Sequence, residues 1–432
     1  MIPPPDKAAV RTQGKARTMI GRVAASRVMR DTSLVAIGQS LFKGTLYLAS
    51  IALSRSLTVD QFATFGYFSV TSRFLSIFFA AGLTIAATKA FADASADQRD
   101  ADRTAAVVFL LISAALLGTA LSPLYLPIVD DEEIRLDGGW LIVGAAAQGA
   151  YAVGLAAMFG ASAFRQLLVP MAIGSAALLL GAAVSARTGE VTPALVGYVA
   201  SFLAPALLFG AGLYRRGPLR LLLPSKAALV TVVRTALPTL AIGTISAGVV
   251  WLVMRVLFDH AESVVEFNKL VIGMQWFVLV LFLPNALGNA LFPRFLHGAR
   301  EGRLDVRLAG GIALSAFAAI GVLAILALLL TPLLSELYGQ HYQFTRAFVF
   351  AIVAAAALAG PVTMLSYPVI AAFGAGRWLL VNLVLLATVV GLLAIRPPQT
   401  ALEAALVLCG GQAAVLLAAL LTLSRIPRAG RG

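Results

Sequence analysis

The chain has 432 residues, of which 60% are hydrophobic and only 12% are charged. A water-soluble protein needs a larger polar share to cover its surface, so this composition excludes a soluble protein and indicates an all-α polytopic membrane protein. The formal net charge of +13 would suit nucleic acid binding, but the distribution of the basic residues along the chain gives a different reason for it.

Residues 1–32 form a basic segment that we expect in the cytoplasm. It is not a signal peptide, because the basic stretch is too long and the apolar run behind it is a full span without a small-residue cleavage site. The single cysteine, Cys409, lies in an apolar run, and the three histidines lie far apart in predicted loops. We therefore expect no disulfide, no metal site and no cofactor.

A spanning helix needs about 20 apolar residues, and roughly twelve such runs follow the basic segment. Most of the 33 lysine and arginine residues fall in every second segment between these runs, beginning with the N-terminal one. Because cytoplasmic loops are rich in Lys and Arg, both termini are predicted to lie inside (N-in/C-in), with the basic surplus facing anionic lipid rather than nucleic acid. The predicted spans are 33–54, 62–88, 105–129, 140–164, 167–186, 192–213, 236–258, 268–292, 308–333, 346–374, 378–395 and 401–423.

The longest cytoplasmic link between spans lies at the midpoint of the chain and is basic and amphipathic, as expected of a connector on the membrane surface. Aligning the two halves places residues 36–38 on 241–243, Phe62 on Phe267 and Lys89 on Arg294. An even number of helices in each half lets both insert in the same orientation. We predict an N-terminal six-helix lobe at 33–213, a connector at 214–235, a C-terminal six-helix lobe at 236–424 and a basic cytoplasmic tail at 425–432.

Two cations lie near the middle of predicted spans, Lys43 in the first and Arg73 in the second. A cation in hydrocarbon costs at least about 2.5–3.5 kcal/mol, so each needs a compensating environment. No Asp or Glu lies deep in any predicted span, which leaves two interpretations: the cations face a hydrated cavity that receives an anion, or they snorkel or bind backbone carbonyls. We favour the cavity. Helical spacing adds further candidates for the substrate site: Gln39, Tyr47, Arg255, Gln275, Asn285 and Asn289.

The charge of this cavity separates classes of substrate. An exporter of cationic drugs usually binds its substrate or coupling ion at a membrane-embedded carboxylate, and none is predicted here. A positive cavity suits a phosphate or pyrophosphate group. The outside loops are too short for the polar chemistry of a polysaccharide polymerase or glycosyltransferase, so an enzyme is not expected. A drug or metabolite exporter of the same fold is the alternative, with a membrane enzyme as a less favoured third hypothesis.

Several segments carry a resemblance to a known family. Residues 52–93 resemble the opening of the Wzx-type polysaccharide flippases, the polysaccharide transport branch of the multidrug/oligosaccharidyl-lipid/polysaccharide exporter (MOP) superfamily. The matching points are Ser54 and Arg55, Phe62, Phe65 and Gly66, Gly82 and Leu83, Lys89 to Ala92, the segment LPNALGNALFPRF at 283–295, and 336–339 with Tyr342.

This resemblance implies a MATE-like fold of two six-helix lobes around a central cavity that opens by alternating access. It implies transport of an undecaprenyl-pyrophosphate-linked oligosaccharide across the bacterial inner membrane for surface polysaccharide, exopolysaccharide or lipopolysaccharide synthesis. In the family the cavity cations hold the pyrophosphate, which matches Lys43 and Arg73 here, with Arg255 a weaker match. The implied partners are this anionic lipid-linked substrate, membrane lipids, a polysaccharide polymerase and glycosyltransferases.

Overall fold

The computed structural model describes residues 37–80, 82–92, 98–129, 136–215, 223–281, 314, 321, 325, 328–329 and 331–424. Within these ranges every regular element is a helix, as predicted, and the first helix occupies residues 37–56. The elements that follow are α2 (Val59–Phe79), α3 (Leu83–Ala92), α4 (Gln98–Ala120), α5 (Ser122–Val129), α6 (Gly138–Gly160), the short 3₁₀ helix η1 (Phe164–Gln166), α7 (Leu168–Thr188), α8 (Thr192–Arg215), α9 (Lys226–His260), α10 (Val264–Val280), α13 (Thr331–Tyr338), α14 (Arg346–Phe373), α15 (Ala375–Ile395) and α16 (Ala401–Leu423).

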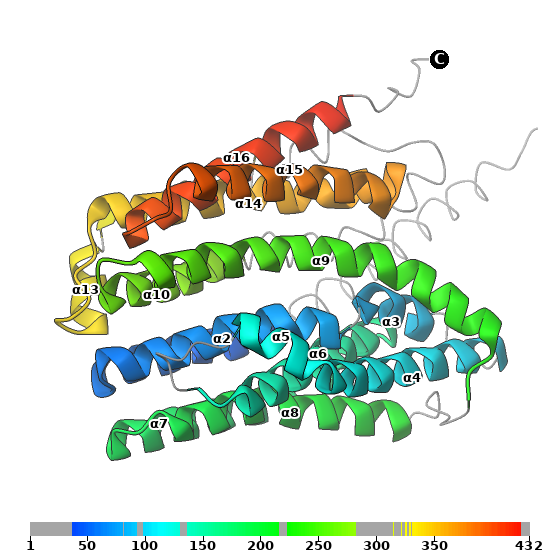
Figure 1. The fold of residues 1–432 in the computed structure, drawn as a ribbon. Coiled ribbons are helices and arrows are strands. Elements are labelled where there is room, and N and C mark those ends of the chain that lie inside the picture. The colour runs from blue at the N-terminus through cyan, green and yellow to red at the C-terminus, as the bar shows by residue number, and fades with distance from the viewer. Residues whose placement is uncertain are drawn as a thin grey trace, which may run out of the picture.

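The long helices run in a roughly common direction and form layers (Figure 1). Helices α14, α15 and α16 form one outer layer, α9 and α10 lie beneath them, and the helices up to α8 form the other side of the molecule. The turn at 57–58, the turn at 261–263 and the link at 339–345 all lie at the end of the bundle that carries α13. We call this end the α13 end.

Several helices begin at a polar residue whose side chain accepts a hydrogen bond from a free backbone amide of the first turn. Thr58 and Gln61 form a reciprocal capping box at the start of α2. Thr345 and Thr400 cap α14 and α16 in one direction, each accepting a hydrogen bond from an amide three residues further on. These caps set where the chain enters each long helix from a short link.

Eight described helices are long and apolar enough to cross a membrane, or nine if α2 and α3 count as one span bent by 54°. This agrees with the predicted class of fold. Helix α9 begins at Lys226, ten residues before the predicted span at 236, because Ser225 caps it and is itself held by Asp102 of α4. The second part of the predicted connector is therefore continuous with the span.

Some predicted features lie outside the described residues. These are the N-terminal segment 1–32, the tail at 425–432, part of the connector at 216–222, and much of the predicted spans at 268–292 and 308–333.

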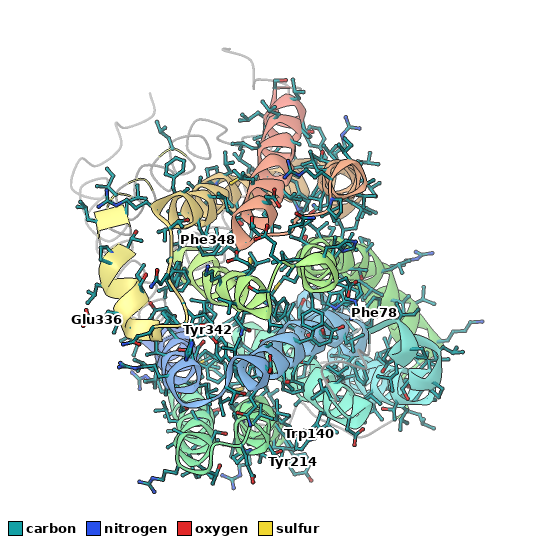
Figure 2. All side chains as sticks on the ribbon, turned by 60° about the vertical axis from the view of Figure 1, so that its left-hand side comes forward. Phe78, Trp140, Tyr214, Glu336, Tyr342 and Phe348 are labelled. Carbon is teal, nitrogen blue, oxygen red and sulfur yellow. The ribbon has the colours of Figure 1, made fainter. Side chains whose placement is uncertain are left out.

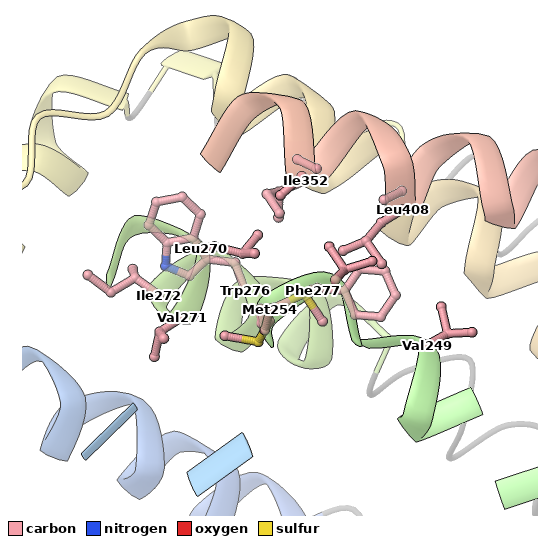
Figure 3. Close-up of a cluster of buried hydrophobic side chains, with 14 of the residues drawn as sticks. Val249, Met254, Leu270, Val271, Ile272, Trp276, Phe277, Ile352 and Leu408 are labelled. Carbon is pink, nitrogen blue, oxygen red and sulfur yellow. The ribbon is translucent and has the colours of Figure 1, made fainter. Parts of the chain in front are cut away.

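The core is apolar and continuous between the layers. Figure 3 shows side chains of α9 and α10, among them Met254 and Trp276, below Ile352 of α14 and Leu408 of α16. Large apolar side chains also cover much of the outside, as Leu124, Leu180 and Ile395 illustrate with exposed fractions of 71%, 68% and 83%. Such extensive apolar exposure suits contact with lipid and not with water.

Candidate functional site: a cationic cavity between the two halves

A cavity of about 630 Å³ lies between the helices up to α8 and those from α9 onward. Lys43 of the first helix and Arg73 of α2 both line it, so the structure brings the two predicted cations to one site. The Lys43 side chain is half-buried, whereas that of Arg73 is exposed within the cavity. Cavities of roughly 300–1,000 Å³ are typical of small-molecule sites.

The depth of the two cations follows from helix geometry. Arg73 lies fourteen residues into α2 from Val59, which places it roughly 20 Å from the α13 end at 1.5 Å per residue. The hydrocarbon core of a bilayer is about 30 Å thick, so this depth is well inside it. The cavity lining extends further from the α13 end, to Ile77, Gly243 and Leu281.

The charge of the lining has one sign. Among the described residues that line the cavity there is no Asp or Glu, and no described carboxylate forms an ion pair with Arg73. Low-dielectric walls concentrate the field of such charges and raise the local concentration of anions. The arrangement therefore favours an anionic ligand over a cationic one.

The other predicted site residues divide into three groups. Tyr47 and Gln275 line the cavity together with the cations. Gln39 and Arg255 are described but are not part of the lining. Asn285 and Asn289 lie outside the described residues.

Arg255 has a different environment, at a contact between the halves. Its guanidinium donates a hydrogen bond of 2.9 Å to the hydroxyl of Tyr67 on α2 and forms an ion pair of 3.2 Å with Asp259, one turn along α9. It also lies 5.8 Å from the centre of the Tyr67 ring, within reach of a cation–π interaction. The sequence offered Arg255 as a weaker candidate for the substrate site, but could not show that α2 supplies a partner.

Three further hydrogen bonds join the halves. The Trp251 indole donates to Thr71 (3.2 Å), Gln275 donates to Ser50 (2.8 Å), and Ser54 donates to the carbonyl oxygen of Tyr338 (3.2 Å). All three link helix 37–56 or α2 to helices from α9 onward. The two halves are thus joined on the α13 side of the cavity, and they meet again at the opposite end, where Asp102 of α4 binds Ser225 at the start of α9.

The link at 339–345 adds an aromatic contact between the two halves. Figure 2 shows Tyr342 beside the helices of the first half, where its ring centre lies 5.7 Å from that of Phe62. Asn268 donates hydrogen bonds to the Tyr342 hydroxyl (3.3 Å) and to the carbonyl oxygen of Val59 (2.8 Å). Burial raises the pKa of Tyr342 to about 12, so the phenol stays neutral over the physiological range and this contact is insensitive to pH.

The sequence missed most of the polar residues on the far wall of the cavity. Each is a single amide or hydroxyl within an apolar span, and the only available signal was that isolation, as for Asn382 in α15. The missed lining residues are Ser246 of α9, Thr363 and Ser366 of α14, Asn382 of α15 and Gln412 of α16.

Comparison with known proteins gives relatives in one functional class. No family model matches the chain. Two curated proteins named EPS I polysaccharide export inner membrane protein EpsE, from Ralstonia nicotianae (strain ATCC BAA-1114 / GMI1000) and Ralstonia solanacearum, are 27% and 26% identical to it. The similarity spans 79% of this chain and 81% of each relative.

Solved structures share the fold. An inward-facing multidrug resistance MATE family transporter of the MOP superfamily superposes with a TM-score of 0.71 at 17% identity, covering 90% of this chain and 94% of the other. The lipid II flippase MurJ in an inward closed conformation gives 0.70 at 14% identity, covering 90% and 87%. The chain is therefore a multi-pass inner-membrane protein with the MATE-like fold of MOP superfamily transporters, and its resemblance to the polysaccharide transport branch is confirmed.

Proposed function

We propose that the chain is a flippase that moves an undecaprenyl-pyrophosphate-linked oligosaccharide between the leaflets of the inner membrane. The observation that carries this proposal is the cavity that Lys43 and Arg73 share with no described carboxylate. A pyrophosphate diester is a double anion, and cationic side chains bind phosphate oxygens through charge-assisted hydrogen bonds. The polysaccharide export proteins and the lipid II flippase among the similar proteins support a lipid-linked anionic substrate.

The position of the cavity supports transport by alternating access. The halves are joined toward the α13 end, and the cavity lies on the far side of this joint. In the N-in/C-in orientation that we propose, this joint faces the outside, and the lipid-linked substrate would enter the cavity from the cytoplasmic side, past the contact of Asp102 with Ser225. Separation of the joint would then expose the same cations to the other side.

Polysaccharide export tests the proposal in cells. In a host strain from which the gene has been deleted, Lys43→Ala and Arg73→Ala are each expected to reduce exported polysaccharide by at least tenfold, because one lost charge-assisted hydrogen bond is worth about 1.5–3 kcal/mol. Lys43→Arg and Arg73→Lys keep the charge and should retain part of the export. Arg187→Ala, which removes an exposed arginine in the last turn of α7, is the matched control and should export normally.

The membrane content of each variant is measured alongside export. Full export by the Lys43→Ala/Arg73→Ala double variant at wild-type protein level would refute the role of the cavity cations. The alternative, a drug exporter, has support in the fold of the MATE neighbours alone. It predicts that the deletion strain becomes sensitive to cationic dyes, while our proposal predicts unchanged sensitivity.

A further inference from the structure

The two sides of the cavity differ in chemistry. Both cations, Lys43 and Arg73, lie on helices of the first half. The opposite side, from α9 onward, contributes described polar residues that are all uncharged amides or hydroxyls. We call this surface the neutral wall, formed by Ser246, Gln275, Thr363, Ser366, Asn382 and Gln412.

Several hydrogen-bond donors of the neutral wall already donate to other groups within the protein. Ser246 donates its hydroxyl hydrogen to Asn382 (3.1 Å), and Asn382, only 5% exposed, is oriented by donating to the carbonyl oxygen of Trp378 (2.9 Å). Thr363 and Ser366 donate theirs to carbonyl oxygens of their own helix. A hydroxyl that has donated its hydrogen still has lone pairs that accept.

Gln275 extends this pattern. Its amide nitrogen donates to Ser50, while its side-chain oxygen is buried and accepts no hydrogen bond from any described residue. That oxygen has almost no accessible surface, so it does not face the cavity. Gln412 contributes a side-chain amide, which can both donate and accept. The neutral wall therefore presents only uncharged groups to the cavity: hydroxyl oxygens that accept, and an amide that also donates.

An uncharged polar surface selects the ligand group that meets it. Sugar hydroxyls both donate and accept, so they suit the hydroxyl oxygens and the Gln412 amide alike. A carboxylate would find no cation on this wall, and the hydroxyls of Ser246, Thr363 and Ser366 have already donated their hydrogens. The charges point to the same conclusion, because the two cations are already balanced by a doubly charged pyrophosphate diester.

We propose that the neutral wall is a subsite for the sugar nearest the pyrophosphate, and that this sugar is an uncharged, hydroxyl-rich hexose rather than a uronic acid. This inference rests on the proposed function. Pyrophosphate lies against Lys43 and Arg73 on one side, and the sugar lies against Ser246 and Gln412 on the other. Asn382 acts as a positioning residue, since it holds the Ser246 hydroxyl.

Binding to the purified full-length protein in nanodiscs tests the subsite with three probes. These are undecaprenyl pyrophosphate, undecaprenyl-pyrophosphoryl glucose and undecaprenyl-pyrophosphoryl glucuronic acid. The wild type should bind the glucose-linked probe roughly tenfold more tightly than either of the others, the equivalent of one or two hydrogen bonds. Equal or tighter binding of the glucuronic acid probe would overturn the inference.

Variants separate the two parts of the site. The Ser246→Ala/Gln412→Leu double variant should lose the preference for the glucose-linked probe while keeping its affinity for bare undecaprenyl pyrophosphate. Asn382→Leu should act in the same direction. The matched control is Thr231→Val, which removes a hydroxyl elsewhere on α9 that bonds within its own helix. It should retain the wild-type preference.

The outcomes also distinguish this inference from the proposed function. If the wild type binds none of the three probes, the proposed function fails and the subsite with it. A different result separates the two claims: Lys43→Ala weakens the binding of all three probes, but the wall variants still prefer the glucose-linked probe. The same holds if the wall variants lose affinity for bare undecaprenyl pyrophosphate as much as for the glucose-linked probe. In both cases the proposed function stands and the subsite is wrong. The Ser246 and Gln412 changes are at the cavity surface, so they keep the test valid if Asn382→Leu does not fold.

Discussion

At the scale of single residues, Gly82 decides how the chain turns from α2 into α3. Its φ of +65° lies in the left-handed region, which favours glycine. A Cβ built on Gly82 would lie 2.5 Å from the backbone nitrogen of Leu240 and would also meet the carbonyl oxygen of Ala236 on α9. We predict that Gly82→Ala lowers the free energy of unfolding by roughly 2–4 kcal/mol, because left-handed strain and overpacking add.

Thermal unfolding of the purified protein in detergent checks this prediction. Gly210→Ala is the control, since Gly210 lies within α8 and a Cβ there would meet no atom within 4 Å. It should leave Tm unchanged or raise it slightly, because alanine suits a helix better than glycine. A Tm that is the same for Gly82→Ala and wild type would mean that α9 does not pack against this turn.

The residues of the site differ in how far the sequence could reveal them. Lys43 and Arg73 were predictable because placing a cation within an apolar span costs free energy and requires a compensating environment. Asn382 and Ser246 were not, because each is a small neutral polar group whose value depends on a partner from another helix. The hydrogen bond between Arg255 and Tyr67 could not be predicted for the same reason. It joins residues far apart in the chain, and no local sequence pattern indicates it.

At the scale of elements, the hydrophobic pattern predicted the class and order of the helices well. Apolar runs of sufficient length located the described spans, but their ends depended on local contacts. Helix α9 begins early because Asp102 of α4 binds the amide and hydroxyl of its cap, Ser225. The sequence likewise did not predict the break between α2 and α3, because Gly82 is the only local sign of a bend within this continuous apolar run.

The ends of the elements allow the proposed orientation to be tested. In a Cys409→Ser background we predict that Glu262→Cys, in the turn at the α13 end, reacts with a membrane-impermeant maleimide added to intact spheroplasts. Gly376→Cys, in the first turn of α15 at the opposite end, should react only after permeabilisation. Glu262 is exposed, and a Cβ at Gly376 meets no atom within 4 Å, so both sites tolerate the change. Labelling in the reverse order would refute N-in/C-in.

At the scale of the whole molecule, the fold brings a positive surface from one half against a neutral surface from the other. In the proposed function, the first half supplies the charge for an anionic head group, and the second supplies uncharged polar groups for sugar hydroxyls. The contacts near the α13 end join the halves on one side of this cavity. In the proposed transport cycle, a change in that joint would move the two surfaces relative to each other and so link substrate binding to access.

Transport by the purified protein in proteoliposomes tests this account most directly. The wild type should move undecaprenyl-pyrophosphoryl glucose between leaflets and should not move the cationic dye ethidium. The Lys43→Ala/Arg73→Ala double variant should be slower by roughly a hundredfold or more, from the loss of two charge-assisted hydrogen bonds, while Lys43→Arg/Arg73→Lys keeps measurable transport. Transport of the lipid by the double alanine variant at the wild-type rate, or transport of ethidium in place of the lipid, would contradict the account.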